Sequence, residues 1–120
     1  MDQRYDINLE TKYEQLTKID VDAEAAAHAP WFNETLAKVN DSVVRLGVIE
    51  GDFHWHQHEH EDEFFLVLDG ELVIELEDRR MTLGPHQAFT IPKGTLHKTS
   101  APTRTVILMV EQAGVVPTGD

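Results

Sequence analysis

Apolar residues between positions 35 and 110 fall into short runs that end at turn-forming residues. The run at 63–68 is apolar after its first residue, which favours a strand that is buried on both faces. Asp69-Gly70 follows this run and predicts a hairpin turn into the run at 71–77. Asn40-Asp41 predicts an earlier turn within the strand-forming region 35–49. Further strands are expected at 81–83, 88–91 and 105–110. Closely spaced short strands predict an all-β fold, an antiparallel sandwich or barrel.

The interior of this predicted fold should be filled by alternating apolar side chains, either as packed core or as pocket lining. The candidates are Phe65, Val67, Leu72, Ile74, Phe89, Ile91, Val106 and Leu108.

The first 34 residues have a different pattern, and we interpret them as an N-terminal extension before a barrel domain at 35–113 and a C-terminal tail at 114–120. Residues 1–20 are irregular, and part of them is expected to pair along a sheet edge or across a dimer. Residues 20–29 begin with acidic residues, are rich in alanine and precede Pro30, which predicts a short helix. Trp31 and Phe32 are expected to anchor the extension on the core, with the lining of a pocket mouth as the alternative.

Composition limits the classes of function. A chain of 120 residues with 22 acidic and 10 basic residues, net charge −12, forms one domain and is poorly suited to binding nucleic acids or anionic membranes. There is no cysteine, so any metal must be bound by nitrogen and oxygen. The sequence has no long apolar run and no signal-peptide pattern at its start, and we therefore expect a cytoplasmic protein without nucleic-acid or membrane partners.

Four of the seven histidines lie close together, at His54, His56, His58 and His60. In a β-strand they would all point to one face, and Glu63 begins the next strand. Imidazole nitrogens and a carboxylate oxygen suit a divalent ion such as zinc, iron, manganese, nickel or copper. A solvated edge strand or an adventitious metal binder is the alternative interpretation.

A distant segment, Pro92-Lys93-Gly94-Thr95-Leu96-His97, places another histidine after a Pro-x-Gly turn. Together, Gly51…His56-x-His58-x4-Glu63-x6-Gly70 and Gly84…Pro92-x-Gly94-x-x-His97 resemble the two motifs of the cupin superfamily, in the right order. The chain departs from the pattern at Ala101, where many cupins have asparagine, and in having four residues instead of five between Gly51 and His56. Neither departure removes a ligand.

The resemblance implies a small single-domain cupin with a jelly-roll β-barrel, in which four side chains bind a divalent metal ion: His56, His58, Glu63 and His97. By the same resemblance, His54 and His60 lie at the barrel mouth or support the ligands, or have no role in the site. His28 and His86 are interpreted as surface or loop residues. Many cupins are dimers, and a homodimer would cover exposed strand edges.

A divalent ion bound by three neutral imidazoles and one carboxylate keeps a single positive charge and has open positions for a ligand. The first hypothesis is therefore a metal-dependent enzyme acting on a small chelating molecule, an oxygenase, isomerase or cyclase of the kinds found among cupins. The second is a metal- or ligand-binding module without turnover, because the sequence offers only His54, His60 and Glu61 as nearby general bases.

Overall fold

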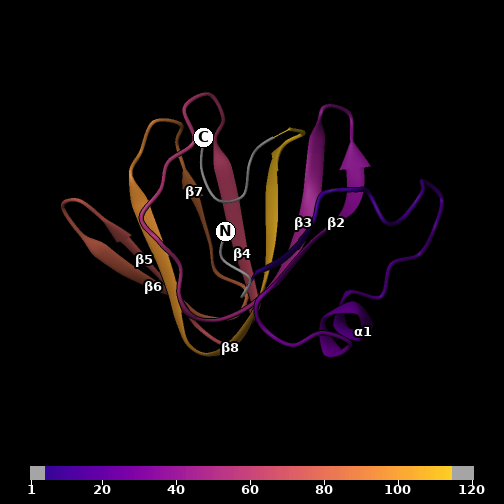
Figure 1. Ribbon diagram of the computed structural model, residues 1–120, viewed down its shortest axis with the longest axis horizontal. Coiled ribbons are helices and arrows are strands. Elements are labelled where there is room, and N and C mark those ends of the chain that lie inside the picture. The colour runs from indigo at the N-terminus through magenta and orange to yellow at the C-terminus, as the bar shows by residue number, and fades with distance from the viewer. Residues whose placement is uncertain (1–4, 115–120) are drawn as a thin grey trace.

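The computed structural model describes residues 5–114. Strand β8 (His97–Gln112) is the central strand of the fold, because it pairs with three other strands. One edge of β8 pairs with β3 (Ser42–Asp52) over most of its length, and its other edge pairs first with β5 (Leu72–Leu76) and then with β4 (Glu63–Asp69). Strand β6 (Arg80–Leu83) joins the sheet through β5. The sheet order is β1-β2-β3-β8-β4-β7, in which β1 is Asp6–Asn8, β2 is Phe32–Val39 and β7 is Ala88–Ile91. Figure 1 shows the result, an open shell with β5 and β6 on one side and β2 and β3 on the other.

The predicted all-β class with a short N-terminal helix is confirmed. In the described residues the elements are β1 (Asp6–Asn8), α1 (Val21–Ala26), β2 (Phe32–Val39), β3 (Ser42–Asp52), β4 (Glu63–Asp69), β5 (Leu72–Leu76), β6 (Arg80–Leu83), β7 (Ala88–Ile91) and β8. The predicted tail at 114–120 lies outside the described residues except for Gly114.

The N-terminal segment joins the sheet through β1, which pairs parallel to β2 at the sheet edge. Helix α1 begins where the sequence predicts, because the Asp20 side chain accepts a hydrogen bond from the Ala23 backbone N–H at 3.1 Å. It ends earlier than predicted, at Ala26. Arg104 donates hydrogen bonds to the carbonyl oxygens of Ala25 and His28 at 2.6 and 3.1 Å, so carbonyls at this end are satisfied without a further helical turn.

The core consists of two clusters of buried apolar side chains. The first cluster has members on each strand from β3 to β8. The second lies beneath α1, on β2, β3 and β8. Six of the eight predicted interior residues are buried: Phe65, Val67, Leu72, Ile74, Ile91 and Val106. The other two, Phe89 and Leu108, are half-buried against these clusters.

Asp69-Gly70 is not the hairpin turn that the sequence predicts. β4 pairs with β7 and β8, whereas β5 pairs with β6 and β8, so the turn carries the chain around a corner between two regions of β8. Gly70 has φ +91°, and a Cβ placed there would lie 2.4 Å from Oγ1 of Thr105. This close approach to β8 requires glycine and holds the corner in place.

Thr105 of β8 makes hydrogen bonds to Glu71 at this corner. We expect Thr105→Val to lower the free energy of unfolding by about 1–2 kcal/mol. Its fully buried hydroxyl accepts a hydrogen bond from Glu71 N–H at 3.0 Å and lies 3.0 Å from the Glu71 carbonyl oxygen, and valine would leave that N–H unsatisfied. Urea denaturation measures the change, with the exposed Thr103→Val as the control. Equal losses for the two variants would contradict this role.

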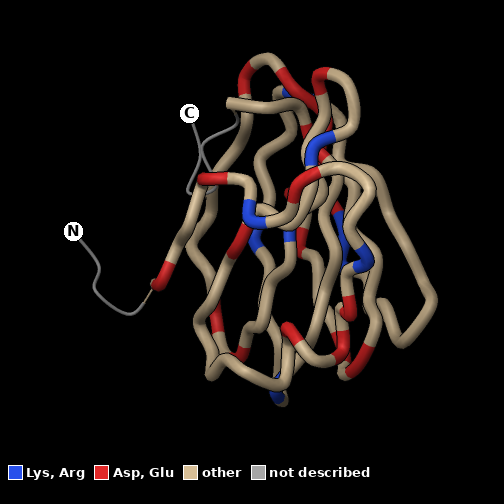
Figure 2. Tube along the Cα trace, turned by 90° about the vertical axis from the view of Figure 1, so that its right-hand side faces the viewer, with Lys and Arg blue, Asp and Glu red and all other residues tan. Residues whose placement is uncertain are grey.

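Acidic positions are distributed over most of the trace in Figure 2, and basic positions are few. No helix among the described residues has the length and apolar character needed to cross a membrane.

Candidate metal centre

The histidine-rich stretch is a loop, and the prediction of a strand with all four imidazoles on one face is wrong. Between the end of β3 and the start of β4, the strand-like pairing is one isolated bridge between His56 and His97. The side chains that alternate with the histidines are mostly polar, and the apolar one, Trp55, is 44% exposed, so no apolar strip holds this stretch to the core. As a result His56 and His58 are buried, whereas His54 and His60 are exposed.

The structure nevertheless brings His56, His58, Glu63 and His97 together. One potential ligand atom from each lies within 4.8 Å of the others, and all four side chains are buried. Glu63 Oε1 lies 3.4 Å from His58 Nε2 and 3.5 Å from His97 Nε2. The His56 and His97 ring centroids are 4.2 Å apart. The four residues identified in the two separate motifs therefore form one buried cluster that could bind a metal ion.

Backbone hydrogen bonds hold the loop against the rest of the cluster. His56 and His97 exchange two backbone hydrogen bonds of 2.9 Å, and Gly94 N–H donates to the His58 carbonyl at 2.8 Å. Glu63 and His97 are the first residues of β4 and β8. Two strand ends thus fix one carboxylate and one imidazole, and the Pro-x-Gly turn fixes the position of His58.

The orientation of the imidazoles suits metal binding. Nδ1 of His56 lies 3.0 Å from the His54 carbonyl oxygen, and Nδ1 of His97 lies 2.9 Å from that of Thr95. A carbonyl only accepts, so each Nδ1 is assigned the proton, and Nε2 is the ring nitrogen that is available to a metal ion. Metal-binding histidines are commonly held by this type of hydrogen bond. The donor set therefore fits a divalent ion that prefers nitrogen and oxygen.

Burial and neighbouring charges favour the protonation states that a metal ion needs. Burial lowers the pKa of His56 to about 4, so this imidazole is neutral near pH 7. Burial alone would raise the pKa of Glu63, but the adjacent His58 and His97 hold it well below its usual range. The carboxylate is therefore ionised and the His56 ring carries no charge.

A buried Arg45–Glu111 pair lies next to this cluster and was not predicted from the sequence. Glu111 lies opposite Glu63 in the β4–β8 register, and its Oε1 is 3.3 Å from Nε of Arg45. Burial, followed by the charge of Glu63, raises the pKa of Glu111 to about 9. The two carboxyl groups therefore carry one negative charge between them near pH 7, and Arg45 balances it. Arg45 also donates hydrogen bonds to Thr35 Oγ1 and Asn33 Oδ1.

The sequence does contain a signal for Glu111. It continues the period-two alternation of Ile107 and Met109 along β8, and all three side chains line one cavity. The predicted strand stopped at residue 110, one position short of this carboxyl group.

The cavity has a volume of about 50 Å³ and opens on the candidate metal-binding cluster, of which His56 and Glu63 line it. Its lining combines three kinds of side chain. Polar residues are Asp6, Asn33, His56, Glu63, Thr99 and Glu111; aromatic residues are Tyr5, Trp31, Phe32, Phe53 and Phe65; aliphatic residues are Ile7, Ile49, Ile107 and Met109. Trp31 thus lines a cavity while packing against the core, so both interpretations of this residue hold.

The remaining histidines have other positions. The backbone carbonyl of His54 orients the His56 ring. The His54 ring itself is exposed and stacks on Phe53, with ring centroids 4.3 Å apart. His60 and Glu61 line a separate surface hollow, and neither they nor His54 line the cavity. His86 is an exposed loop residue.

His28 is a half-buried loop residue whose ring stacks on Phe32 with centroids 3.5 Å apart. With Glu24 and Glu34 it forms a second group of potential ligand atoms. Lys12 Nζ lies 2.9 Å from Glu24 Oε1 and 3.7 Å from Glu34 Oε1, so an ammonium group already serves these carboxylates as their cation.

Comparison with known proteins agrees with this architecture. Residues 42–111 match the family model described as Cupin domain. An 80-residue stretch, 66% of this chain and 71% of the relative, is 45% identical to YdbB of Bacillus subtilis, which is described as an uncharacterized protein.

Solved structures show the same fold. A cupin-2 domain containing protein from Shewanella frigidimarina is 33% identical, with a TM-score of 0.75 over 78% of this chain and 93% of that one. A protein from Neisseria meningitidis is 19% identical, with a TM-score of 0.73 over 80% of this chain and 99% of that one, and shows the fold alone. The predicted cupin-type jelly roll is therefore confirmed, although its sheet is not closed into a complete barrel.

Proposed function

The chain belongs to the cupin family, and from this premise we propose that His56, His58, Glu63 and His97 bind one divalent metal ion beside which the protein binds and converts a small chelating molecule. The observation that supports this proposal is a buried four-donor cluster that opens on a cavity. A purely structural metal site would have no need of an adjoining cavity.

A divalent ion in this cluster would supply Lewis acidity toward a carbonyl or enolate oxygen. The chain's own side chains would bind the rest of the molecule. The apolar lining excludes water, while the Asn33 amide and the Glu111 carboxyl are polar groups of the cavity outside the four-donor cluster. Arg45 fixes both of these groups through its guanidinium.

The charges around the cavity restrict the ligand further. No lysine or arginine is among the described residues that line it, whereas Asp6, Glu63 and Glu111 are. Phosphate groups are normally bound by cations or by clusters of backbone N–H groups. The proposed ligand is therefore neutral or singly charged, such as a small keto acid, hydroxy acid or diketone.

The second candidate is a binding module without turnover, and one observation favours it. The general bases proposed from the sequence, His54, His60 and Glu61, do not line the cavity. Under this alternative the ion and its ligand would bind as described but no product would form.

Protein loaded anaerobically in turn with iron(II), manganese, nickel and zinc should bind at least one compound from a panel of small keto acids, hydroxy acids and diketones. We expect His56→Ala to abolish this binding, because it removes a donor that faces the cavity. Calorimetry measures binding, mass spectrometry detects conversion, and circular dichroism checks that the variant is folded. Metal-dependent conversion identifies an enzyme, binding without conversion identifies the module, and no binding by any metal form would reject both.

A further inference from the structure

We propose that an aromatic wall, formed by Tyr5, Trp31 and Phe53, limits this site to chelators whose apolar part is no larger than a short alkyl group, and that Tyr5 sets the limit. This inference rests on the proposed function, because it concerns the ligand of the same cavity. It adds the size class of that ligand and the residue that determines it.

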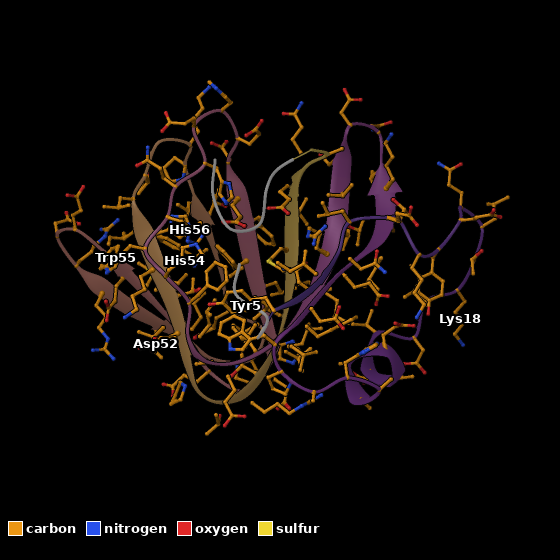
Figure 3. The ribbon with its side chains drawn as sticks, in the orientation of Figure 1. Tyr5, Lys18, Asp52, His54, Trp55 and His56 are labelled. Carbon is orange, nitrogen blue, oxygen red and sulfur yellow. The ribbon has the colours of Figure 1, made fainter. Side chains whose placement is uncertain are left out.

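The three rings form one continuous surface of the cavity. Tyr5 contacts Trp31 edge-on with ring centroids 5.3 Å apart, and it contacts Phe53 at 4.9 Å. Trp31 and Phe53 are 5.4 Å apart, and the Phe53 ring lies 5.1 Å from that of His56. Figure 3 shows Tyr5 within the shell, on the same side as His54 and His56. The wall therefore extends from the N-terminal segment to the metal-binding cluster.

Two of the three rings come from outside residues 42–111, the part of the chain that matches the family model. Their position depends on the pairing of β1 with β2. Asp6 lies opposite Phe32 in this parallel pair, and Asp6 N–H donates to the Trp31 carbonyl at 3.1 Å. This pairing places Tyr5 beside Trp31, so the N-terminal segment adds a wall to the cavity of the cupin fold.

The volume of the cavity decides whether the wall attracts or excludes a bulky group. An apolar cavity of about 150 Å³ accommodates benzene. The cavity here measures about 50 Å³, which leaves room for only a few atoms beside a bound chelating group. A phenyl substituent that entered this space would have to displace part of the wall, so steric exclusion outweighs favourable stacking.

Tyr5 is the member of the wall that can change with least effect on the fold. The Phe53 ring contacts the rings of His54 and His56 with centroids 4.3 and 5.1 Å away, and Trp31 packs against the larger core cluster. Tyr5 directly precedes the three-residue strand β1 at the sheet edge. Truncating its side chain should therefore enlarge the cavity by roughly the volume of a phenol ring without removing a core residue.

Acetohydroxamic acid and benzohydroxamic acid test this inference because they share one chelating group and differ in a methyl or a phenyl substituent. Isothermal titration of the nickel-loaded, full-length protein should show acetohydroxamate binding at least about tenfold more tightly, equivalent to about 1.4 kcal/mol. In Tyr5→Ala this preference should fall at least about tenfold through tighter benzohydroxamate binding, with acetohydroxamate affinity nearly unchanged. Tyr5→Phe, which keeps the ring, should retain the wild-type preference.

An unchanged preference in Tyr5→Ala, or weaker benzohydroxamate binding by that variant, would overturn the inference while leaving the metal site intact. Tighter benzohydroxamate than acetohydroxamate binding by the wild-type protein would also overturn it. If the wild-type protein takes up no nickel, the same titrations are made with whichever of iron(II), manganese or zinc it takes up. If no metal form binds either hydroxamate, the inference fails, whereas the proposed function is decided by the panel of keto acids, hydroxy acids and diketones.

Discussion

Saturating divalent metal should raise the midpoint of thermal unfolding of the wild-type protein by about 10 °C, and His97→Ala should lose most of this rise. An ion that binds only the folded state stabilises it by about 2.7 kcal/mol at a concentration one hundred times the dissociation constant. For a domain of this size, that free energy corresponds to a shift of about 10 °C. His97 is 1% exposed and its Nδ1 faces the Thr95 carbonyl, so its loss removes a buried and oriented donor. Differential scanning calorimetry with and without each metal measures the shift.

His86→Asn is the matched control for this experiment. His86 is exposed and has φ +67°, a conformation that asparagine tolerates better than alanine. His28 is less suitable, because it stacks on Phe32 beside Glu24 and Glu34. The metal-induced shift is compared within each variant, so any destabilisation of the metal-free form cancels. Equal shifts for His97→Ala and His86→Asn would contradict the assignment of His97 as a ligand.

Arg45→Met should lower the free energy of unfolding by about 3 kcal/mol, the lower end of the range for breaking a buried ion pair. Arg45 is 2% exposed and lies next to Glu111, which is 4% exposed. Without the guanidinium, the ionised Glu63 loses its balancing charge, and Asn33 and Thr35 lose a donor. Because the pKa of Glu111 is already raised to about 9, this carboxyl group can stay protonated and uncharged without Arg45. The loss of stability should therefore not reach the upper end of the range for buried ion pairs. Urea denaturation of the metal-free protein measures the loss.

A double variant separates the charge effect from simple loss of packing. Arg45→Met combined with Glu111→Leu removes both members of the pair and replaces them with apolar groups. It should be more stable than the sum of the two single losses predicts, by about 1 kcal/mol or more. Additive losses would show that Arg45 and Glu111 do not stabilise each other, and would contradict the pairing of these two side chains.

The four members of the candidate metal-binding cluster were predictable from the sequence, although the local structure proposed for them was not. The two motifs fix residue types and spacing, and the Gly94 turn holds the His58 backbone whether or not the histidine stretch forms a strand. Alternation of histidines predicted a strand, but the alternate positions carry no apolar strip, and one bridge to His97 replaces a full ladder. The pattern was correct about which residues meet and wrong about the backbone between them.

Other features depend on tertiary pairing that no local pattern reveals. The hairpin predicted at Asp69-Gly70 is a corner, because the two flanking strands, β4 and β5, each pair with β8 and not with each other. Arg45 lies within an apolar run of β3, and its partner Glu111 is far away in the sequence. Tyr5 belongs to a segment without clear periodicity, and only the register of β1 on β2 places it at the cavity.

The long path of β8 also determines the order in which the molecule can assemble. Its partners begin as far back as Ser42, which pairs with Gln112, so most of the contacts it makes are between residues widely separated in the chain. Such non-local pairing slows folding, because loop-closure entropy is lost before any contact compensates for it. His97 and His56 can approach each other only when this last strand docks. The candidate metal-binding cluster therefore cannot be complete until the chain has been synthesised through His97 and this residue has docked against His56.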